Sequence, residues 1–382
     1  MKSTNYQYIS ALDHLRGFAA ILVLFFHGGH FIAYKITYGS TYDPSNWLKA
    51  NDPFSALVIE GHTAVSLFFV LSGFIFTVGA IQKKISYLGF YRNRILRTYP
   101  LFIFILLAGV LVYPENFDFW GLLKSIFFMA NSDTAIDGGA FTFVFWSIAV
   151  EWHFYLIFPA LIALVRSRGW KSLLALLIVF LFIRCIAYFQ NVDMREISYW
   201  SIIGRIDQFV IGMLAGIYYR SKFRESLRFD IQALLGLIAV LSVLFIFNQH
   251  GGGGLNNHVW IYWTTIESSV WAIFVLGYLS VTRHFPVFIN KGLIALGTVS
   301  YSIYLTHFIV LDFFMRNDFD RIVTTESALG TAVINISLFI MPLVIGLSSI
   351  TYYFVERPFL ERRKGYIQEK SALDQKENSF CG

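Results

Sequence analysis

ALDHLRGFAAILVLFFHGGH, residues 11–30, is too apolar to lie on the surface of a soluble protein. After Gly17 it runs for nine residues without a polar side chain, and His27 follows them. A membrane-spanning helix needs about 20 predominantly apolar residues, which this stretch provides. It therefore predicts a first transmembrane helix that carries ionisable side chains.

The polar residues of this first helix lead to a functional hypothesis. Arg16 and His27 are eleven residues apart, close to three helical turns, so they share a face and lie roughly 16 Å apart along the axis. Ionisable groups are costly in lipid, and they usually face a bundle interior or a wet cavity where they have a function. The alternative is an arginine that reaches the lipid headgroups and a histidine that a neighbouring helix satisfies.

The composition of the whole chain is that of a polytopic membrane protein. Of its 382 residues, 56% are hydrophobic and only 14% are charged, whereas soluble domains carry about a quarter charged residues. The apolar runs are continuous rather than alternating, which excludes a transmembrane barrel and leaves an all-α helical bundle. The net charge of +6 comes from basic residues between the spans, so we expect no nucleic-acid partner.

Ten spans are predicted, and the Lys and Arg residues between them orient the chain. Of these 30 residues, 21 fall in segments that an inside N-terminus places in the cytoplasm, six in outer loops and three in spans. This bias predicts that both termini are cytoplasmic, in a multi-pass protein of the inner (plasma) membrane. The predicted spans are 11–33, 62–81, 98–113, 143–165, 172–190, 205–220, 230–248, 259–281, 292–314 and 330–354.

Residues 1–360 are predicted to form one transmembrane domain, and 361–382 a charged cytoplasmic tail without fixed structure. The first apolar run lacks a clear cleavage site, so we expect it to be retained as a helix. The two cysteines, Cys185 and Cys381, predict neither a disulfide framework nor a zinc site. No cluster of metal ligands is evident, and we expect no metal cofactor.

A cluster of arginines stands near the predicted inner surface, in YRNRILRTYP at 91–100. Arg92, Arg94 and Arg97 suit a ligand with several phosphates, because each guanidinium can make bidentate contacts. An anchor for anionic lipid headgroups is an equally good interpretation of the cluster alone.

Glu151, in FWSIAVEWHFYLIFPAL at 145–161, needs a partner or a role inside its span. It lies about 12 Å below the outer surface and His27 about 24 Å from the inner one, in the same half of a core about 30 Å thick. The two are therefore expected to meet, with the carboxylate holding the tautomer of His27 and raising its basicity. A structural ion pair is the alternative.

Other stretches add polar groups to the apolar background. Ser72, in SLFFVLSGFIFT, offers a hydroxyl donor, although packing through small residues explains it as well. Tyr301 and His307, in GTVSYSIYLTHFIV, are candidates to line a polar cavity, and a histidine satisfied between helices is an equal alternative. Glu356, in VERP, is placed to pair with the arginines. The outer loops are rich in Gly, Asn, Tyr and Trp, which suits a sugar acceptor or ordinary connectors, and the glycines at 251–254 predict a flexible turn.

Taken together, these stretches resemble the membrane acyltransferase-3 family, the O-acyltransferases of bacterial surface polysaccharides and peptidoglycan. The matching pieces recur in the family's order over nearly the whole chain, so the set is specific although each piece is weak. Trp152 departs from the pattern, because a second Glu is frequent there, and this weakens a mechanism that needs two carboxylates at that point. The pieces are LDHLRGFAAILVLFFH (12–27), FFVLSGF (68–74), RNRILRTYP (92–100), WSIAVEWHFYLIFP (146–159), RIDQFVIGMLAG (205–216), SYSIYLTH (300–307) and VERP (355–358).

The resemblance implies transfer of an acyl group, commonly acetyl, from cytoplasmic acyl-CoA to a hydroxyl group at the outer face. The acceptor is then a glycan or a lipid-linked sugar. By matching position, His27 is the catalytic histidine and Arg16 its essential partner, and our assignment adds Glu151. The arginines at 92–97 match an Arg-x-x-Arg feature and are assigned to the CoA phosphates. The residues assigned to the substrate cavity are Asp13, Ser72, Tyr301 and His307.

In the expected mechanism, His27 acts as general base on the acceptor hydroxyl, and an acyl-histidine intermediate is the competing route. A backbone amide or Ser72 would stabilise the oxyanion. The rival function is a transporter or flippase for a glycolipid or anionic solute, which would use the same buried groups. A membrane scaffold explains the spans but not the ionisable residues. The acceptor, the acyl group and the oligomeric state stay open.

Overall fold

The computed structural model describes residues 8–40, 42–221 and 229–368. Within these ranges the regular structure is helical apart from one short antiparallel pair, β1 (Lys84–Ile85) and β2 (Ile367–Gln368). The prediction of an all-α helical bundle is confirmed.

Nine helices in the described part of the chain are long and apolar enough to cross a membrane, and a bent pair, α12 with α13, makes a tenth span. Each predicted span falls on one of them. Three short helices, α2 (Pro53–Ile59), α5 (Phe119–Ile126) and α8 (Met194–Trp200), lie in the connections. The spans are α1 (Ser10–Tyr38), α3 (Thr63–Ala80), α4 (Tyr87–Val112), α6 (Phe145–Arg168), α7 (Lys171–Phe189), α9 (Ile202–Arg220), α10 (Phe229–Gln249), α11 (Trp260–Val281), α12 (Val287–Thr298) with α13 (Ser300–Arg316), and a last span that comprises α14 (Ala328–Asn335), α15 (Met341–Thr351) and α16 (Arg357–Leu360).

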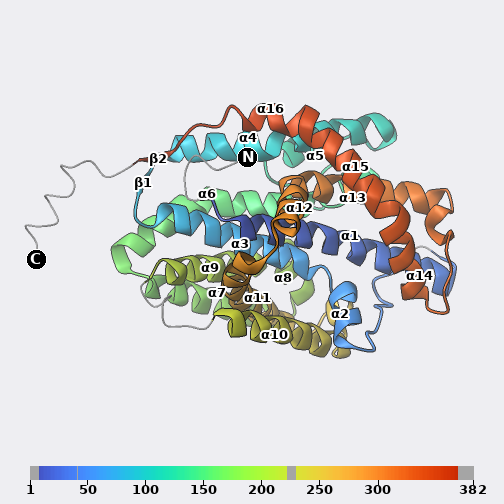
Figure 1. Cartoon of the computed structure of the whole chain (residues 1–382), viewed down its shortest axis with the longest axis horizontal. Coiled ribbons are helices and arrows are strands. Elements are labelled where there is room, and N and C mark those ends of the chain that lie inside the picture. Colours follow the sequence, from blue (N-terminus) through green and yellow to red (C-terminus); the bar gives the residue numbers. More distant parts are fainter. Residues whose placement is uncertain (1–7, 41, 222–228, 369–382) are drawn as a thin grey trace, which may run out of the picture.

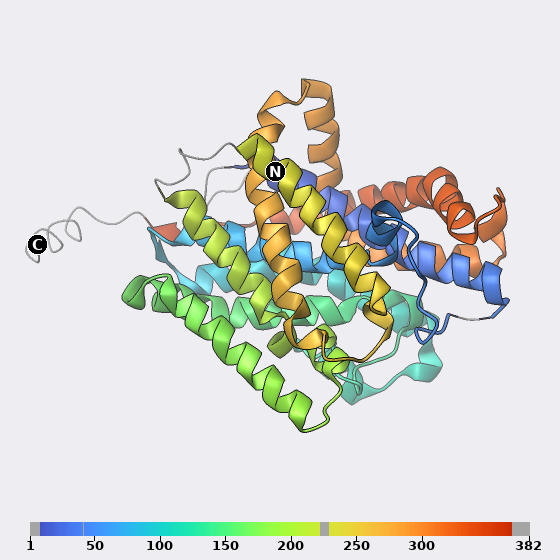
Figure 2. The same ribbon diagram turned by 90° about the horizontal axis from the view of Figure 1, so that it is seen from below.

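Helix α1 lies in the middle of the bundle. Figure 1 shows α4 and α16 along one edge, α10 and α11 along the opposite edge, and α1, α3 and α6 between them. Figure 2 shows α7 as the outermost helix on one side. Most of the side chains of α7 are exposed, as a lipid-facing helix requires, whereas most of those of α1 are buried. The ionisable residues of α1 therefore face protein and cavities rather than lipid.

Glycines let the central helices approach closely. A Cβ on Gly73 would lie 2.0 Å from the carbonyl oxygen of Phe209, where α3 packs on α9. A Cβ on Gly297 would lie 2.0 Å from the carbonyl oxygen of Asp13, where α12 packs on α1. Such contacts need a residue without a side chain. They hold in place the helix segments that carry Ser72 and Asp13.

Two spans differ from their predictions. The third was expected over 98–113, but α4 begins at Tyr87, capped by the Ser86 hydroxyl, which accepts a hydrogen bond from the amide of Gly89. The arginines lower the local hydropathy without interrupting the helix. The ninth was expected as one helix over 292–314, but the chain bends by 66° between α12 and α13. Hydropathy reports the apolar length of a span and not its straightness.

Part of the predicted tail belongs to the folded domain. Strand β2 pairs with β1, and the ring of Tyr366 is buried against the ring of Phe90, with their centroids 5.6 Å apart. The rest of the predicted tail, 369–382, lies outside the described residues.

Candidate active site

Two of the cavities enclosed by the described residues hold the candidate site residues, and they are named here for their polar groups. The arginine cavity has a volume of about 180 Å³ and is lined chiefly by α1, α3, α4, α6 and α13. The histidine cavity has a volume of about 420 Å³ and is lined by α1, the loop before α2, the N-terminal end of α6, and α8. Ligand sites commonly measure about 300–1,000 Å³. The histidine cavity can therefore hold a sugar-sized molecule, and the arginine cavity only a narrow part of a ligand.

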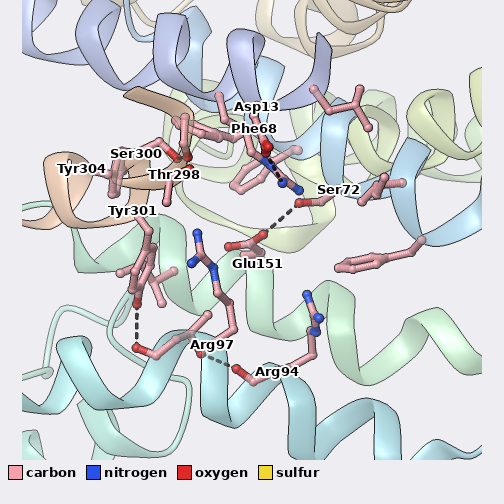
Figure 3. Close-up of a pocket in the computed structure, with 18 of the residues that line it drawn as sticks. Asp13, Phe68, Ser72, Arg94, Arg97, Glu151, Thr298, Ser300, Tyr301 and Tyr304 are labelled. Atoms are coloured by element: carbon pink, nitrogen blue, oxygen red, sulfur yellow. Dashed lines mark hydrogen bonds and ion pairs between the residues drawn. The ribbon is translucent and has the colours of Figure 1, made fainter. Parts of the chain in front are cut away.

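The arginine cavity carries an excess of positive charge. Figure 3 shows Glu151 near its centre, with Arg94 and Arg97 extending toward it from α4. More guanidinium groups than carboxylates favour a polyanionic ligand, and guanidinium groups bind phosphates bidentately. The charged residues that line this cavity are Arg16, Arg94, Arg97, Arg363, Asp13 and Glu151.

The helical geometry of α4 separates the three predicted arginines. Arg94 and Arg97 are three residues apart, so they share a face and both line the cavity. Arg92 is about 200° around the helix from Arg94; its side chain is exposed and donates to the carbonyl oxygen of Arg362 at 3.3 Å. Arg92 therefore does not line the arginine cavity, and the assignment of all three arginines to the CoA phosphates stays a prediction.

The predicted pairing of Glu356 with the arginine cluster is confirmed. Glu356 is buried and accepts a hydrogen bond from Arg97, with 3.2 Å between Nη1 and Oε2. The Ser302 hydroxyl donates to the other carboxylate oxygen. Glu356 ends a π-helical turn of the last span, Tyr352–Glu356, a distortion that often occurs at functional sites. The pair ties α4 to α13 and the last span at the arginine cavity.

Four more of the predicted residues line the arginine cavity. Ser72 donates to Glu151 at 2.8 Å, and Arg16 lies 3.5 Å from Asp13 on the next turn of α1. Tyr301 also lines it, and its hydroxyl donates to a backbone carbonyl of α4 at 2.8 Å. These residues therefore surround the same space as the arginines, as Figure 3 shows for Asp13, Ser72 and Tyr301.

His27 lies in the other cavity and has a histidine partner. Its Nδ1 atom is 2.9 Å from Nε2 of His307, and the two rings stack with centroids 5.1 Å apart. His307 is fully buried, and its Nδ1 lies 2.7 Å from the carbonyl oxygen of Tyr304 and 3.2 Å from that of Ile303. Helix α13 thus holds His307 by its own backbone and presents it to α1.

This hydrogen-bond network assigns the protons of both neutral rings. A carbonyl oxygen only accepts, so Nδ1 of His307 carries the hydrogen and Nε2 of His307 is the acceptor. Nδ1 of His27 must then donate to it, which leaves the lone pair of His27 on Nε2. His307 therefore presents His27 as a base with one defined nitrogen, as an orienting partner does in general-base catalysis.

The expected meeting of His27 with Glu151 does not occur in the structure. His27 lines the histidine cavity and contacts His307, whereas Glu151 lines the arginine cavity and contacts Ser72. Depth along the membrane normal was estimated from the sequence, but the direction in which each side chain leaves its helix was not. Arg16 is likewise on the side of the arginine cavity and not beside His27.

The sequence analysis missed two histidines that line the histidine cavity with His27. His30 follows His27 by three residues, on the same face of α1, and this spacing was the available signal. His62 precedes α3, and its Nε2 lies 3.0 Å from the buried carboxylate of Glu60. The same carboxylate accepts from the indole of Trp47 at 2.7 Å. Hydropathy does not mark this pair as functional, because Glu60 precedes the second predicted span and His62 is only its first residue.

The backbone of the glycine run at 251–254 packs against the carboxylate of Glu60. The Gly253 amide donates to Oε2 of Glu60 at 3.1 Å, and a Cβ on Gly252 would lie 2.1 Å from Oε1. Gly251 and Gly252 have positive φ angles, 103° and 57°. The glycine run thus forms a turn, as expected, and its lack of side chains is required because backbone approaches the buried carboxylate.

Aromatic side chains form the walls of the histidine cavity. Tyr199 and Trp146 line it, and the buried guanidinium of Arg205 lies over Tyr199, 4.6 Å from the ring centroid. Tyr199 belongs to α8, outside the spans, and burial raises its pKa to about 12, so its hydroxyl stays protonated at neutral pH. Such flat aromatic walls suit the apolar face of a ligand ring, and Arg195 adds a positive charge to the lining.

Two residues, Val65 and Tyr304, line both cavities. The Tyr304 hydroxyl is hydrogen-bonded to the Ser147 hydroxyl at 2.6 Å, and its ring meets the Phe68 ring edge-on with centroids 5.9 Å apart. We call this pair, Val65 and Tyr304, the partition. Because the same two side chains line both, the arginine cavity and the histidine cavity are neighbours across the partition.

Comparison with known families identifies the chain. The profile of the acyltransferase-3 family, described as an acyltransferase domain, matches residues 9–353. The chain belongs to the acyltransferase-3 family. The predicted family and the prediction of an acyltransferase are thereby confirmed.

Relatives of this acyltransferase-3 chain have diverged widely. It is 22% identical to the O-acetyltransferase OatA of Staphylococcus aureus strain MRSA252 over 408 residues, covering 98% of this chain and 60% of OatA. It is 28% identical to an uncharacterized protein of Haemophilus influenzae over 217 residues, 49% of this chain and 88% of that protein. A segment is 35% identical to the acyltransferase MdmB of Streptomyces mycarofaciens over 118 residues, 28% of this chain and 30% of MdmB. No solved structure matches.

Among residues 8–40, 42–221 and 229–368, no group of three or more His, Cys, Asp or Glu side chains is placed to hold a metal ion. His27, His30 and His62 share one cavity but not one coordination centre.

Proposed function

We propose that the chain is a membrane O-acyltransferase that moves an acyl group, acetyl in the first instance, from acyl-CoA to a hydroxyl group of a glycan or lipid-linked sugar. The observation that carries the proposal is the His27–His307 pair, which directs a lone pair into a sugar-sized cavity that neighbours the arginine cavity. The O-acetyltransferase relative supports the choice of reaction, although this chain spans 60% of its length.

The arginine cavity is the proposed donor site. Arg94 and Arg97 are positioned to bind phosphates of CoA, and the narrow cavity to take the pantetheine arm with its thioester. Arg92, on the exposed face of α4, remains a candidate for phosphates that stay outside the cavity. Arg16 and Glu151 lie in this cavity too, so we assign them to donor binding and positioning rather than to His27.

In the proposed step, the acceptor lies in the histidine cavity and the thioester approaches through the partition. His27 Nε2 takes the proton of the acceptor hydroxyl while the hydroxyl oxygen attacks the thioester carbonyl carbon. The carbon–sulfur bond then breaks, and the CoA thiolate leaves and takes the proton from His27. The products are an ester and free CoA. His307 stabilises the transient imidazolium by accepting from Nδ1 of His27.

A covalent route uses the same lone pair. His27 Nε2 would attack the thioester, release CoA thiolate and carry the acyl group until the acceptor hydroxyl removes it. Label on the protein after reaction with radiolabelled acetyl-CoA in the absence of acceptor favours this route, and its absence favours direct transfer.

The orientation of the bundle is part of the proposal. The excess of Lys and Arg in one set of loops favours cytoplasmic termini in a plasma membrane. The arginine cavity then opens toward the cytoplasm, where acyl-CoA is made, because Arg16 lies near the start of α1. The histidine cavity faces the outer side, where a surface glycan or a lipid-linked sugar is exposed.

The test is acetyl transfer from radiolabelled acetyl-CoA by the full chain in liposomes, with a mixed glycan extract as acceptor. The variant is His27→Asn, whose amide keeps a donor near Nδ1 for His307 but lacks the basic nitrogen. We expect transfer to fall about 10²- to 10⁴-fold, the usual contribution of a general base. The matched control, His250→Asn, changes an exposed histidine outside both cavities.

Two results would overturn this proposal. Full transfer in a folded His27→Asn protein would remove His27 from the reaction. Uptake of an anionic solute or glycolipid flipping by the wild type, without transfer from any acyl-CoA, would favour the transporter.

A further inference from the structure

We propose that the acceptor carries an anionic group, a phosphate or a carboxylate, and that the guanidinium of Arg195 binds this group in the histidine cavity. This inference rests on the proposed function, and it adds the charge of the acceptor to its chemical class. The observation that carries it is Arg195, which lines the histidine cavity and has no ion-pair partner among the described residues.

The lining of the histidine cavity has an unbalanced charge. Among the described residues that line it, Arg195 is the only lysine or arginine, and none is an aspartate or a glutamate. The arginine cavity differs, because Asp13 and Glu151 line it together with its guanidinium groups. A cavity that presents one sign of charge concentrates ligands of the opposite sign. The histidine cavity therefore favours a ligand with a negative charge.

The protein holds Arg195 in place and leaves the end of its guanidinium available. The backbone amides of Met194 and Arg195 donate to the side-chain oxygen of Asn256 at 3.2 and 3.3 Å, and Nε of Arg195 donates to the carbonyl oxygen of Gly253 at 2.5 Å. The side chain is half-buried, and neither Nη1 nor Nη2 forms a hydrogen bond with another described residue. These two nitrogens can donate together to two oxygens of one phosphate or carboxylate.

Two carboxylates lie close to Arg195 in the fold without pairing with it. Glu196 is its neighbour in the chain and is exposed. Glu60 is buried behind Gly253, whose amide it binds, and each of its carboxylate oxygens has two hydrogen-bond partners. A carboxylate offers about four lone-pair sites, so these partners satisfy Glu60 without Arg195. The charge of Arg195 thus remains available to a ligand.

Other cations of the predicted outer loops have structural partners. Lys35 forms an ion pair with Asp320 at 3.1 Å, and Arg316 forms one with Asp312 at 2.7 Å. Neither Lys35 nor Arg316 lines the arginine cavity or the histidine cavity. Arg195 differs in both respects, because it lines a cavity and has no carboxylate partner in the described part of the chain.

The rest of the cavity suggests what carries the anionic group. Its volume of about 420 Å³ accommodates a sugar ring with one charged substituent, and Trp146 and Tyr199 offer flat walls to the apolar faces of the ring. A ligand bound to Arg195 through its anionic group is anchored in the cavity that also contains His27. Two sources supply this chemistry, namely the phosphate of a lipid-linked sugar and the carboxylate of an acidic glycan.

The experiment compares three competitors that differ in charge. Acetyl transfer to glycan extract is measured with the full chain in detergent micelles, at saturating acetyl-CoA so that anions do not occupy the donor site. The competitors are methyl β-D-glucopyranoside, which is neutral, methyl β-D-glucopyranosiduronate, which carries a carboxylate, and α-D-glucose 1-phosphate. The readout is the inhibition constant Ki of each compound.

In the wild type, the better of the two anionic compounds should have a Ki about 10- to 100-fold below that of the neutral glucoside. High salt should reduce this difference, because it screens interactions between charges. A lower Ki for the phosphate supports a lipid-linked sugar as the source, and a lower Ki for the carboxylate supports an acidic glycan. The salt dependence tests the inference without any substitution.

The variants are Arg195→Gln, which removes the charge, and Arg195→Lys, which retains it. In Arg195→Gln, the Ki of the preferred anionic compound should rise about 10- to 100-fold, whereas that of the glucoside should change less than twofold. Arg195→Lys should retain part of the preference, because an ammonium attracts an anion without two parallel hydrogen bonds. Arg321→Gln, at an exposed arginine outside both cavities, is the matched control, and thermal unfolding shows whether each variant folds.

Equal Ki values for the charged and neutral compounds in the wild type would overturn the inference. Failure of all three to compete while transfer to glycan extract proceeds would do the same. An equal rise in all three Ki values in Arg195→Gln would give Arg195 a structural role and also contradict the inference. Absence of transfer to glycan extract is a different result, because it contradicts the proposed function itself.

Discussion

The arginine cavity combines hydroxyl groups with charged residues, some of which form ion pairs: Arg16 lies 3.5 Å from Asp13, and Arg97 lies 3.2 Å from Glu356. The histidine cavity is lined by three imidazoles, each with one nitrogen within hydrogen-bond distance of a protein acceptor, and also by Arg195 and three tyrosines. Charge attracts from any direction, so several arginines can share the binding of one polyanion. A lone pair acts in one direction only. We therefore expect substitutions in the arginine cavity to reduce acyl transfer by graded amounts. Substitutions in the histidine cavity should reduce it abruptly.

After His27→Asn, the largest effect should come from His307→Asn. The amide retains a donor near Nδ1 for the Tyr304 carbonyl but has no acceptor for Nδ1 of His27. His27 can then carry its hydrogen on Nε2, where it no longer acts as a base. We expect kcat to fall about 100-fold with KM for acetyl-CoA nearly unchanged. Steady-state transfer assays check this, with His250→Asn as control, and an unchanged kcat would break the proposed histidine pair.

The next effect concerns the donor site. Arg94→Gln removes one guanidinium that lines the arginine cavity, while Arg97 remains. A charge-assisted hydrogen bond contributes about 1.5–3 kcal/mol, so KM for acetyl-CoA should rise about 30-fold. Because these are interactions between charges, the difference from the wild type should shrink at higher ionic strength.

Transfer assays at low and high salt measure both features of Arg94→Gln, with kcat as the internal control. A fall in kcat without a change in KM would contradict the division of labour between the two cavities. It would place Arg94 at the reaction centre instead of the donor site.

A smaller effect is expected at the partition. Val65→Ala removes two methyl groups between the cavities, and the Tyr304 hydroxyl stays bonded to Ser147. The wider passage should raise kcat/KM for butyryl-CoA relative to acetyl-CoA about fivefold, since a few methylene groups change selectivity by about this order. Val78→Ala, a buried valine of α3 outside both cavities, is the matched control.

The ratio of the two donors in competition assays measures the effect of Val65→Ala. The same ratio in Val65→Ala, in Val78→Ala and in the wild type would show that the acyl group does not pass between Val65 and Tyr304.

The smallest effect is expected for Arg92→Gln. Its side chain is exposed and contacts a backbone carbonyl rather than the cavity, so KM for acetyl-CoA should change less than twofold at physiological salt. A change as large as that of Arg94→Gln would show that the donor phosphates lie outside the cavity and would move the donor site to the surface of α4.

Much of the arginine cavity could be predicted from short sequence segments. Arg94 and Arg97 are neighbours on one helix, and Asp13 and Arg16 on another, so their local spacing already places each pair together. Arg92 was the exception, because the geometry of the helix directs its side chain away from the arginine cavity. The pairing of Glu356 was also expected from the predicted topology, because both segments lie at the same end of their spans.

The histidine cavity could not be predicted in this way. His27 and His307 are 280 residues apart, and Glu60, the carboxylate beside His62, lies in a connection that hydropathy does not describe. Depth estimates pointed to Glu151 as the partner of His27, because residues at similar depth are indistinguishable until the rotation of each helix is known. His30 was visible in the sequence, but nothing there indicated that it lines the same cavity as His27.

The sequence by itself determined the class of fold, the spans and the candidate reaction, because hydropathy over about 20 residues and the order of short motifs are properties of the chain alone. Only the tertiary structure decided that two cavities exist, which residues each contains, and that His307 rather than Glu151 accompanies His27. The physical reason is that a hydrogen bond depends on distances and directions within a few tenths of an ångström between helices. These distances and directions depend on how the helices pack and on the rotation of each helix about its axis. The close contact between Gly297 and the backbone of α1 is one example.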